Sequence, residues 1–190
     1  MIKPGHNKNA TSSVWSFLVL PAALWSIVYH TPPLHFHPTM EVSALYIEYE
    51  GRVLLLHRQD DRSEGNCWGV PAGKLKPYET PLECVLRETR EETGCDFSGQ
   101  RVDFVATVYI ELDEAHHIVY HLFRAAWIQD PATVAIRFCE HKGFTWVTLA
   151  QASKLSLMQD EDVCLKLAYP EYALYTNGFK NWFLPASDSH

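Results

Sequence analysis

The sequence predicts an α/β fold in which helices cover a mixed β-sheet. Three observations support this prediction. The chain has 190 residues, enough for one domain with a sizeable core. Apolar runs of strand length recur between turns rich in Gly, Pro and polar residues, and helical patterns are interspersed among them. One of those helices, expected at 80–93, carries signals for both its start and its end.

Composition narrows the class of protein. Apolar residues make up 47% and charged residues 21%, the balance of a globular chain rather than a disordered one. The net charge of −7 gives no global attraction for nucleic acid, so an anionic ligand would need a bound cation. The cysteines, 5 in number, form no CxxC pair, which indicates reduced thiols in a cytoplasmic protein.

Residues 1–40 differ in character from the rest and are expected to be an extension of a domain that spans 41–190. Residues 14–29 are strongly apolar but fall short of the roughly 20 residues of a membrane-spanning helix, so no membrane partner is expected. Residues 30–38 hold three prolines and three histidines, which predict a solvated linker rather than a metal site. A protein that begins at Met40 should then fold, unless residues 14–29 cover the core.

The first part of the domain predicts a hairpin and two irregular segments. Residues 42–58 predict two strands joined by a tight turn at Glu50-Gly51. The second strand contains a continuous apolar run, which indicates burial on both faces. A polar loop follows at 60–66, and residues 68–75 predict a short strand that runs into a loop.

The helix expected at 80–93 has the clearest boundaries in the chain. Thr80 suits the N-cap, Pro81 the first helical position, and Glu83 completes a T-x-x-E capping box. Gly94 suits a left-handed residue that ends the helix. The sequence therefore fixes both ends of this helix before any tertiary contact is known.

Two faces are expected on this helix. The residues predicted to face the core are Leu82, Leu86 and Thr89, with Val85 at the margin. Another face carries three glutamates at spacing i, i+3 and i+4, namely Glu88, Glu91 and Glu92. Like charges at this spacing repel by a few tenths of a kcal/mol per pair. Such a cluster destabilises the helix when no cation is bound, and it becomes favourable when the carboxylates surround a cation.

The remaining chain predicts strands first and helices afterwards. Three further strands are expected, at 102–112, 117–128 and 143–149. A short helix is expected from 149 or 150 to about 155, and a longer one from about 160 to 169. Pro170 ends or interrupts the longer helix.

The stretch 73–95, GKLKPYETPLECVLRETREETGC, contains the pattern that decides the interpretation. It resembles the Nudix hydrolase signature, G-x5-E-x7-R-E-U-x-E-E-x-G-U, in which U is usually a bulky aliphatic residue. Every fixed Gly, Glu and Arg position is matched, while Thr89 and Cys95 stand at the U positions. The order of elements from about 42 to 169 also resembles that family. The resemblance implies a Nudix fold, an α/β/α sandwich with a mixed β-sheet.

The resemblance also implies a metal site and its ligands. Oxygen ligands suit Mg²⁺ or Mn²⁺. By the family's pattern the ligands would be the Gly73 carbonyl with Glu91, Glu92 and Glu88, the last of which is also a candidate for activating water. Arg87 would orient a glutamate through an ion pair, and Glu79 would support the loop. The alternative without a functional site is a solvated acidic helix, and it does not account for the matched spacing of Gly73 and Glu79.

Residues outside the motif are assigned less directly. Glu140, just before the strand at 143–149, is the candidate catalytic base, in competition with surface acids at Glu111, Asp113 and Glu114. Four residues flank the expected cleft and are candidates for substrate binding: Lys74, Lys76, Arg58 and Trp68. For the lysines an ordinary surface role is an equal alternative, and for Trp68 a core or rim position is at least as common.

The expected reaction is Mg²⁺-dependent hydrolysis of a pyrophosphate bond in a nucleoside diphosphate linked to some group X. A nucleoside triphosphate, including an oxidised or non-standard one, is the leading substrate, and it would release a nucleoside monophosphate. The alternative substrate is ADP-ribose or another nucleotide sugar. An alternative of another class is a non-catalytic Nudix-like regulator that binds nucleotides. The sequence neither predicts nor excludes a homodimer.

Overall fold

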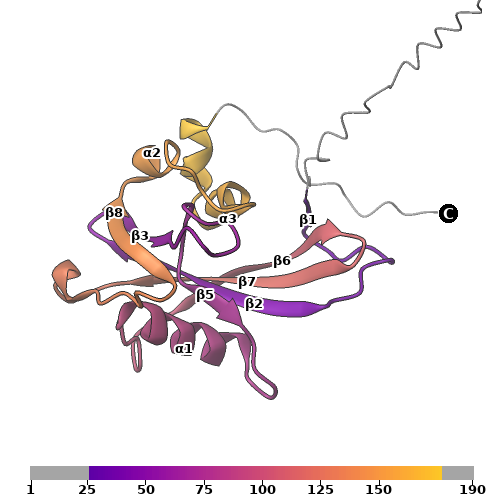
Figure 1. The fold of residues 1–190 in the computed structure, drawn as a ribbon, viewed down its shortest axis with the longest axis horizontal. Helices are drawn as coiled ribbons and strands as arrows, with labels where there is room; N and C mark the ends of the chain where they lie inside the picture. The colour runs from indigo at the N-terminus through magenta and orange to yellow at the C-terminus, as the bar shows by residue number, and fades with distance from the viewer. Residues whose placement is uncertain (1–25, 177–190) are drawn as a thin grey trace, which may run out of the picture.

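A computed structural model describes residues 26–176 of the chain (Figure 1). Expectations for residues 1–25 lie outside this part. The strands are β1 (Ile27–Tyr29), β2 (Met40–Tyr49), β3 (Arg52–Arg58), β4 (Trp68–Gly69), β5 (Ala72–Lys74), β6 (Asp103–Asp113), β7 (His116–Ala126) and β8 (His141–Val147). The helices are α1 (Pro81–Thr93), α2 (Leu149–Ala152), α3 (Glu161–Ala168) and the short 3₁₀ helices η1 (Pro131–Thr133) and η2 (Pro170–Tyr175).

The strands form one mixed sheet of order β1-β6-β7-β2-β3-β4. Strand β2 runs parallel to β7, while the other pairs recorded in the sheet are antiparallel. Strands β2 and β3 pair only next to their turn, at Glu48↔Val53 and Tyr49↔Arg52. Beyond that point they separate, because β5 pairs with β2 while β4 and β8 pair with β3. This separation opens the sheet where the functional site lies.

Helices cover both faces of the sheet, so the predicted sandwich is confirmed. Helix α1 lies on one face, and α2, α3 and η2 lie on the other (Figure 1). Successive β2 side chains enter two separate cores: Leu45 and Ile47 pack on the α1 side, and Ala44 and Tyr46 on the α3 side. The continuous apolar run of β3 divides between the same two cores, so its predicted burial on both faces is confirmed.

The hairpin between β2 and β3 is formed as the sequence predicts. Glu50 and Gly51 have φ values of 47° and 72°. Two successive residues with positive φ are typical of the tight turns whose twist matches that of the flanking strands. The turn fixes the register of the one short segment where β2 and β3 remain paired.

Both predicted ends of helix α1 are confirmed. Thr80 Oγ1 accepts a hydrogen bond from the Glu83 backbone N–H, and the Glu83 side chain accepts one from the Thr80 N–H. Gly94 has φ 70°, and its N–H donates to the Arg90 carbonyl at 3.0 Å. The helix that carries the acidic motif is therefore held at both termini.

Removal of the Thr80 cap should weaken this helix measurably. We expect Thr80→Ala to lower the free energy of unfolding by about 1 kcal/mol, because the Glu83 backbone N–H loses its side-chain acceptor. Urea denaturation would measure the change, and Thr80→Ser should retain most of the stability. Equal stability of the alanine variant and the wild type would contradict this role.

The predicted core face of α1 is confirmed for Thr89 and wrong for Leu82. Leu82 is 42% exposed, whereas Val85, Thr89 and Glu92 are buried. These three residues follow i, i+4 and i+7 spacing, so they form the stripe that faces the sheet. Glu92 therefore does not lie on a solvated acidic face. It enters the protein beside the core.

The folded part extends upstream of the boundary expected at Met40. Strand β1 pairs with the edge strand β6, from Ile27↔Glu111 to Tyr29↔Tyr109. Phe36, in the segment expected to be a solvated linker, is 7% exposed and stacks on His117. Edge pairing and aromatic packing draw this segment onto the domain, so we now expect a protein that begins at Met40 to be less stable.

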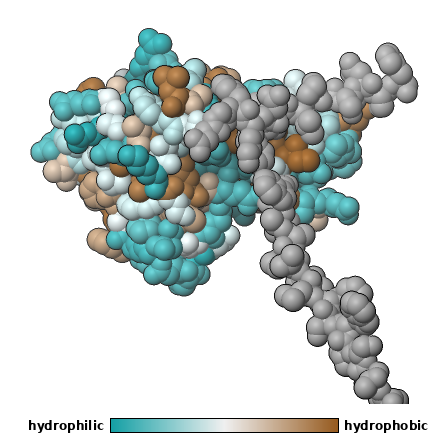
Figure 2. All heavy atoms as spheres, turned by 90° about the horizontal axis from the view of Figure 1, so that it is seen from above, coloured by the Kyte–Doolittle hydropathy of each residue, from teal (hydrophilic) through white to brown (hydrophobic). Residues whose placement is uncertain are grey.

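The outer surface shows separate hydrophobic patches between hydrophilic side chains on the face viewed in Figure 2. Within residues 26–176, no helix has both the length and the apolar character needed to span a membrane. All the cysteines are free, as the sequence predicts.

Candidate active site

Glu92 is a buried carboxylate of the site. Its side chain accepts a hydrogen bond from the Ala72 N–H on β5 at 3.1 Å, and the residue is only 4% exposed. Burial, with a further contribution from Glu140 and Glu88, raises the pKa of the Glu92 carboxyl to about 8. Burial of a carboxyl group with a single hydrogen bond lowers the stability of the folded protein, and such groups are typical of functional sites.

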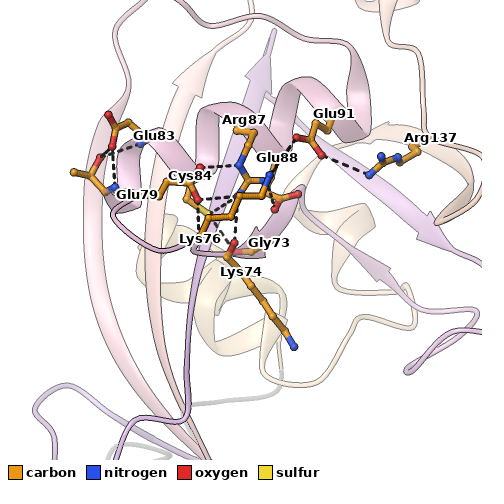
Figure 3. A network of polar contacts seen from close by, with 11 residues as sticks. Gly73, Lys74, Lys76, Glu79, Glu83, Cys84, Arg87, Glu88, Glu91 and Arg137 are labelled. Carbon is orange, nitrogen blue, oxygen red and sulfur yellow. Dashed lines mark hydrogen bonds and ion pairs between the residues drawn. The ribbon is translucent and has the colours of Figure 1, made fainter.

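Arg87 organises the other carboxylates of the motif (Figure 3). Its Nε and Nη2 donate to the two oxygens of Glu79 at 2.6 and 2.8 Å, a bidentate pair. Its Nη1 donates to Glu88 at 2.5 Å, and its Nη2 to the Lys74 carbonyl at 3.2 Å. The Arg87 guanidinium lowers the pKa of Glu79 to about 2. The pair therefore joins the middle of helix α1 to the loop after β5.

Gly73 lets Glu88 approach the backbone of β5. A Cβ atom built on Gly73 would lie 2.1 Å from the carboxyl carbon of Glu88, closer than any real contact. The Gly73 carbonyl faces the helix as well, because Cys84 Sγ lies 3.4 Å from it. The motif therefore requires glycine here for close approach rather than for a special backbone angle.

We expect Gly73→Ala to reduce kcat/KM by about a hundredfold, because the new methyl group displaces the Glu88 carboxylate from its place beside β5. Steady-state kinetics would measure the loss. Gly99→Ala is not a suitable control because Gly99 has φ 75°, whereas Gly143→Ala is, since its Cβ would meet only His57 at 4.0 Å. Full activity in Gly73→Ala would contradict the close approach.

A second arginine links the helix to the loop before β8. Arg137 Nη1 lies 3.6 Å from Glu91 Oε2 and 3.0 Å from Glu140 Oε1. Glu91 also lies 3.9 Å from Lys76 Nζ, and Figure 3 shows Arg137 reaching toward Glu91 from a neighbouring segment. The structure thus brings Glu140 to the acidic face of α1. Glu111 lies elsewhere, where it accepts a hydrogen bond from Tyr29.

A cavity of about 470 Å³ opens where β2 and β3 separate. Glu92, Gly73 and Lys74 line it beside Arg58 and His141. Its remaining walls include apolar residues of β2, β6 and β7 and the segment that leads into α3. The volume and the mixture of apolar walls with a few polar groups are typical of a small-molecule site.

The candidate substrate-binding residues divide into two groups. Arg58 and Lys74 line the cavity. Trp68 is instead stacked on His57, with ring centroids 4.1 Å apart, and it is not among the residues that line the cavity. Lys76 is likewise outside the lining and faces Glu91. The cavity therefore has two cationic side chains beside Glu92.

Sequence reasoning missed several residues of this site. His141 is 5% exposed and lines the cavity, and its Nδ1 has no hydrogen-bond partner among residues 26–176. Burial lowers the pKa of His141 to about 4, so the ring is neutral at neutral pH. Arg137, Asp160 and Glu161 were also missed. The available signal was the position of Arg137 and His141 next to the candidate base Glu140.

The donor chemistry of the site fits a hard divalent cation. Within residues 26–176 no three acidic, imidazole or thiol side chains are already gathered tightly enough to hold an ion, because Arg87 draws Glu88 and Glu91 toward itself. Glu92 nevertheless is a buried carboxylate with the carboxylates of Glu88 and Glu140 nearby. A cation there would offset both its desolvation and this repulsion.

Comparison with known proteins decides the family. The model of the NUDIX domain matches residues 37–167 of this chain. The chain belongs to the Nudix family. Its mixed sheet between helices and the motif at 73–95 agree with that membership, so the protein is a Nudix hydrolase.

Named relatives of this Nudix hydrolase cover most of its folded part. The CTP pyrophosphohydrolase of Escherichia coli (strain K12) is 27% identical over 118 residues, which is 62% of this chain and 82% of the relative. The asymmetrical bis(5'-nucleosyl)-tetraphosphatase of Mus musculus is 32% identical over 136 residues, 70% of this chain and 84% of the relative. The crystal structure of the MutT protein from Methanosarcina mazei Go1 has a TM-score of 0.58 and 27% identity, and it covers 70% of this chain and 96% of that one.

Proposed function

We propose that this Nudix hydrolase cleaves a pyrophosphate bond of a nucleoside triphosphate and releases a nucleoside monophosphate and pyrophosphate. One observation carries the proposal: the buried Glu92 shares one cavity with Arg58 and Lys74. Two cations beside a metal-binding carboxylate suit a polyphosphate, whose charge would otherwise be repelled by a chain of net charge −7.

The proposed metal ligands are Glu92, Glu88, Glu91 and the Gly73 carbonyl, and Mg²⁺ is the proposed ion. When bound, the ion neutralises charge on the phosphate oxygens and lowers the pKa of water. Arg87 ion-pairs with Glu88 and Glu91, so their use as ligands requires the side chains to turn toward Glu92. Glu79 would keep Arg87 in place during that change, since it holds two of its nitrogens.

Glu140 is the proposed general base. It lies within electrostatic reach of Glu92 and is held by Arg137 at 3.0 Å. A carboxylate in this place could take a proton from the attacking water, while Arg58 and Lys74 hold phosphate oxygens. The water oxygen then forms a bond to phosphorus as the bridging P–O bond breaks, and the pyrophosphate leaves with the electron pair.

The choice of a nucleoside triphosphate rests on the cavity and on one relative. The cavity of about 470 Å³ suits one nucleoside with its phosphates rather than two nucleosides. The E. coli relative is named for CTP, which is such a substrate. The mouse relative is named for a dinucleoside tetraphosphate, so this larger class belongs in the same assay.

The test is hydrolysis of a nucleotide panel by the full chain with Mg²⁺. The panel contains the standard triphosphates, 8-oxo-dGTP, ADP-ribose and a bis(5'-nucleosyl) tetraphosphate. We expect a nucleoside monophosphate and pyrophosphate from the triphosphates, with a higher kcat/KM than from the other classes. Tight nucleotide binding without turnover of any compound would support a non-catalytic regulator instead.

A further inference from the structure

The backbone around His141 fixes this residue between helix α1 and strand β3. The His141 N–H donates to the Arg137 carbonyl at 3.0 Å, and the Arg137 N–H donates to the Glu92 carbonyl at the same distance. On the other side, the Gln59 N–H donates to the Glu140 carbonyl at 3.0 Å. The imidazole ring therefore stands on a turn that cannot move independently of the helix that carries Glu92.

A bulge between β3 and β8 brings His141 to the cavity. His57 pairs with Gly143, whereas the next residue, Arg58, pairs with His141, so Lys142 is the extra residue of the bulge. Bulges change the direction of the side chains beside them and are common next to active sites. Directly paired residues point to the same face of a sheet, and both Arg58 and His141 line the cavity. The bulge thus places an arginine and a histidine together on one wall.

The His141 ring lacks the hydrogen bonds that a buried polar side chain normally makes. Within residues 26–176, buried side-chain atoms without a partner belong to Ser43, Thr89, His117, His121 and His141. Of these residues, His141 alone lines the cavity. The great majority of buried polar atoms have a partner. An exception on the wall of a cavity indicates that a ligand supplies the missing partner.

The environment of the ring favours a proton on Nε2. A buried N–H without an acceptor is rarer in proteins than an acceptor without a donor, so the unpartnered Nδ1 is the unprotonated nitrogen. Because burial lowers the pKa of His141 to about 4, the ring takes up no second proton at neutral pH. Nε2 also forms no hydrogen bond within residues 26–176, and it is not fully buried. The ring therefore presents one neutral N–H donor.

An anionic oxygen would satisfy the donors on this wall. Arg58 Nε donates to the Ser63 carbonyl at 2.7 Å, and the terminal nitrogens of Arg58 have no partner within residues 26–176. Arg58 is near enough for its charge to act on the His141 ring. A guanidinium only donates, and so does the protonated nitrogen of a neutral imidazole. A phosphate oxygen offers several lone pairs and a charge to both donors.

We propose that His141 donates a hydrogen bond from Nε2 to a phosphate oxygen of the substrate, next to Arg58. The inference rests on the proposed nucleotide hydrolysis and adds a residue that binds the polyphosphate. Arg58 supplies electrostatic attraction, while the neutral ring supplies direction. Glu140 directly precedes His141, so the residue that holds the phosphate and the proposed base belong to one fixed turn.

Calorimetry of the full-length protein with Mg²⁺ and inorganic pyrophosphate, the proposed product, measures this contact without turnover. We expect His141→Phe to raise the Kd by about tenfold or more, because phenylalanine keeps a flat ring and removes a hydrogen bond to a charged group. His141→Gln should keep the Kd within about threefold of the wild type, because its amide can donate from nearly the same place.

Hydrolysis should follow the same order. We expect kcat/KM for a triphosphate to fall by about tenfold or more in His141→Phe at saturating Mg²⁺, and to recover in His141→Gln. Glutamine restores the donor but not the packing of the ring. Recovery therefore distinguishes a hydrogen bond to the substrate from a purely structural role of the imidazole.

His117→Phe is the matched control. His117 is also 5% exposed and also has a ring nitrogen without a partner within residues 26–176, but it does not line the cavity. The pyrophosphate Kd of this variant should equal that of the wild type. An equal loss of affinity in His117→Phe and His141→Phe would show a general effect of losing a buried imidazole, and it would overturn the contact.

Equal pyrophosphate affinity in the wild type and His141→Phe would overturn the contact while leaving the proposed hydrolysis intact. Weak binding by both His141→Phe and His141→Gln, with wild-type thermal transitions, would overturn the hydrogen bond. If His141→Phe does not fold, His141→Leu takes its place.

If the wild type cleaves no triphosphate, the proposed function fails, and the pyrophosphate measurement decides the role of His141 alone. A Kd that rises in His141→Phe and recovers in His141→Gln then supports the contact. A wild-type protein that binds no pyrophosphate overturns it.

Discussion

Replacement of Glu92 by glutamine should reduce kcat/KM by about a thousandfold, a size typical of losing a group that stabilises charge in the transition state. Glutamine keeps the shape and can still accept from the Ala72 N–H, which Glu92 does at 3.1 Å. It loses the negative charge that would bind the cation. The loss should appear in kcat and not only in KM, because the ion acts on the reacting phosphate.

The same variant should be more stable than the wild type when no metal is bound. The pKa of Glu92 is about 8 in the folded protein, above its ordinary value of 4.5. A group whose pKa is raised on folding stabilises the folded state fully at a pH below its ordinary pKa. This contribution is lost as the pH rises through the pKa of the folded state. We therefore expect equal stability near pH 4 and an advantage for Glu92→Gln that grows up to about pH 8.

Thermal unfolding with and without Mg²⁺ separates the two effects. Millimolar Mg²⁺ should raise the Tm of the wild type, because an ion bound only by the folded state stabilises it, and should leave Glu92→Gln unchanged. Glu114→Gln, in the exposed turn between β6 and β7, is the control and should behave as the wild type in both assays. Full hydrolysis by Glu92→Gln would overturn the assignment of the metal site.

Replacement of Arg87 by methionine should lower the free energy of unfolding by about 2 kcal/mol at neutral pH. The value lies between those of exposed and buried ion pairs, since Arg87 and Glu79 are 20% and 12% exposed. Methionine fills much of the same volume but leaves the carboxylates of Glu79 and Glu88 without their donor. Activity should also fall, because both Glu88 and the loop after β5 lose an anchor.

The pH dependence of this difference has a defined sign. The pKa of Glu79 is about 2 in the folded protein, below its ordinary value of 4.5. A group whose pKa is lowered on folding stabilises the folded state at a pH above its ordinary pKa. This contribution is lost as the pH falls through the pKa of the folded state. The stability gap between the wild type and Arg87→Met should therefore narrow as the pH falls from about 4.5 to 2.

Urea denaturation at several pH values would test this. Arg101→Met is the matched control, because Arg101 also donates to a carboxylate, Asp103, but is 86% exposed. It should leave the unfolding transition unchanged. Equal loss of stability in the two variants, or a gap for Arg87→Met that does not depend on pH, would contradict the role given to the Glu79 pair.

Features encoded locally could be predicted from the sequence. The caps of α1 need only Thr80, Glu83 and Gly94 in the right order, and the hairpin needs only a tight turn at Glu50-Gly51. The motif at 73–95 is equally local, because one loop and one helix carry all of it. Strand positions followed from apolar runs bounded by turns. For these elements, short-range physics and the tertiary structure agree.

Features created by tertiary packing could not be predicted in this way. The helix face was misjudged because Leu82 was given priority over Val85, yet Val85 is buried and Leu82 is 42% exposed. Arg137 and Asp160 reach the site from segments without a periodic pattern, so only the fold shows their proximity. β1 was missed because three residues gain stability from pairing with an edge strand and have little strand signal alone.

The parallel pairing of β2 with β7 bears on how quickly the site can form during folding. The register joins Met40 to Ile118 and Glu48 to Ala126, so a long loop must close before this pair gains any hydrogen bond. β5, which carries Gly73 and the N–H that holds Glu92, is attached to the same central strand. Helix α1 can form early from its own caps, whereas the carboxylate it carries reaches its partner only with this slow, non-local step.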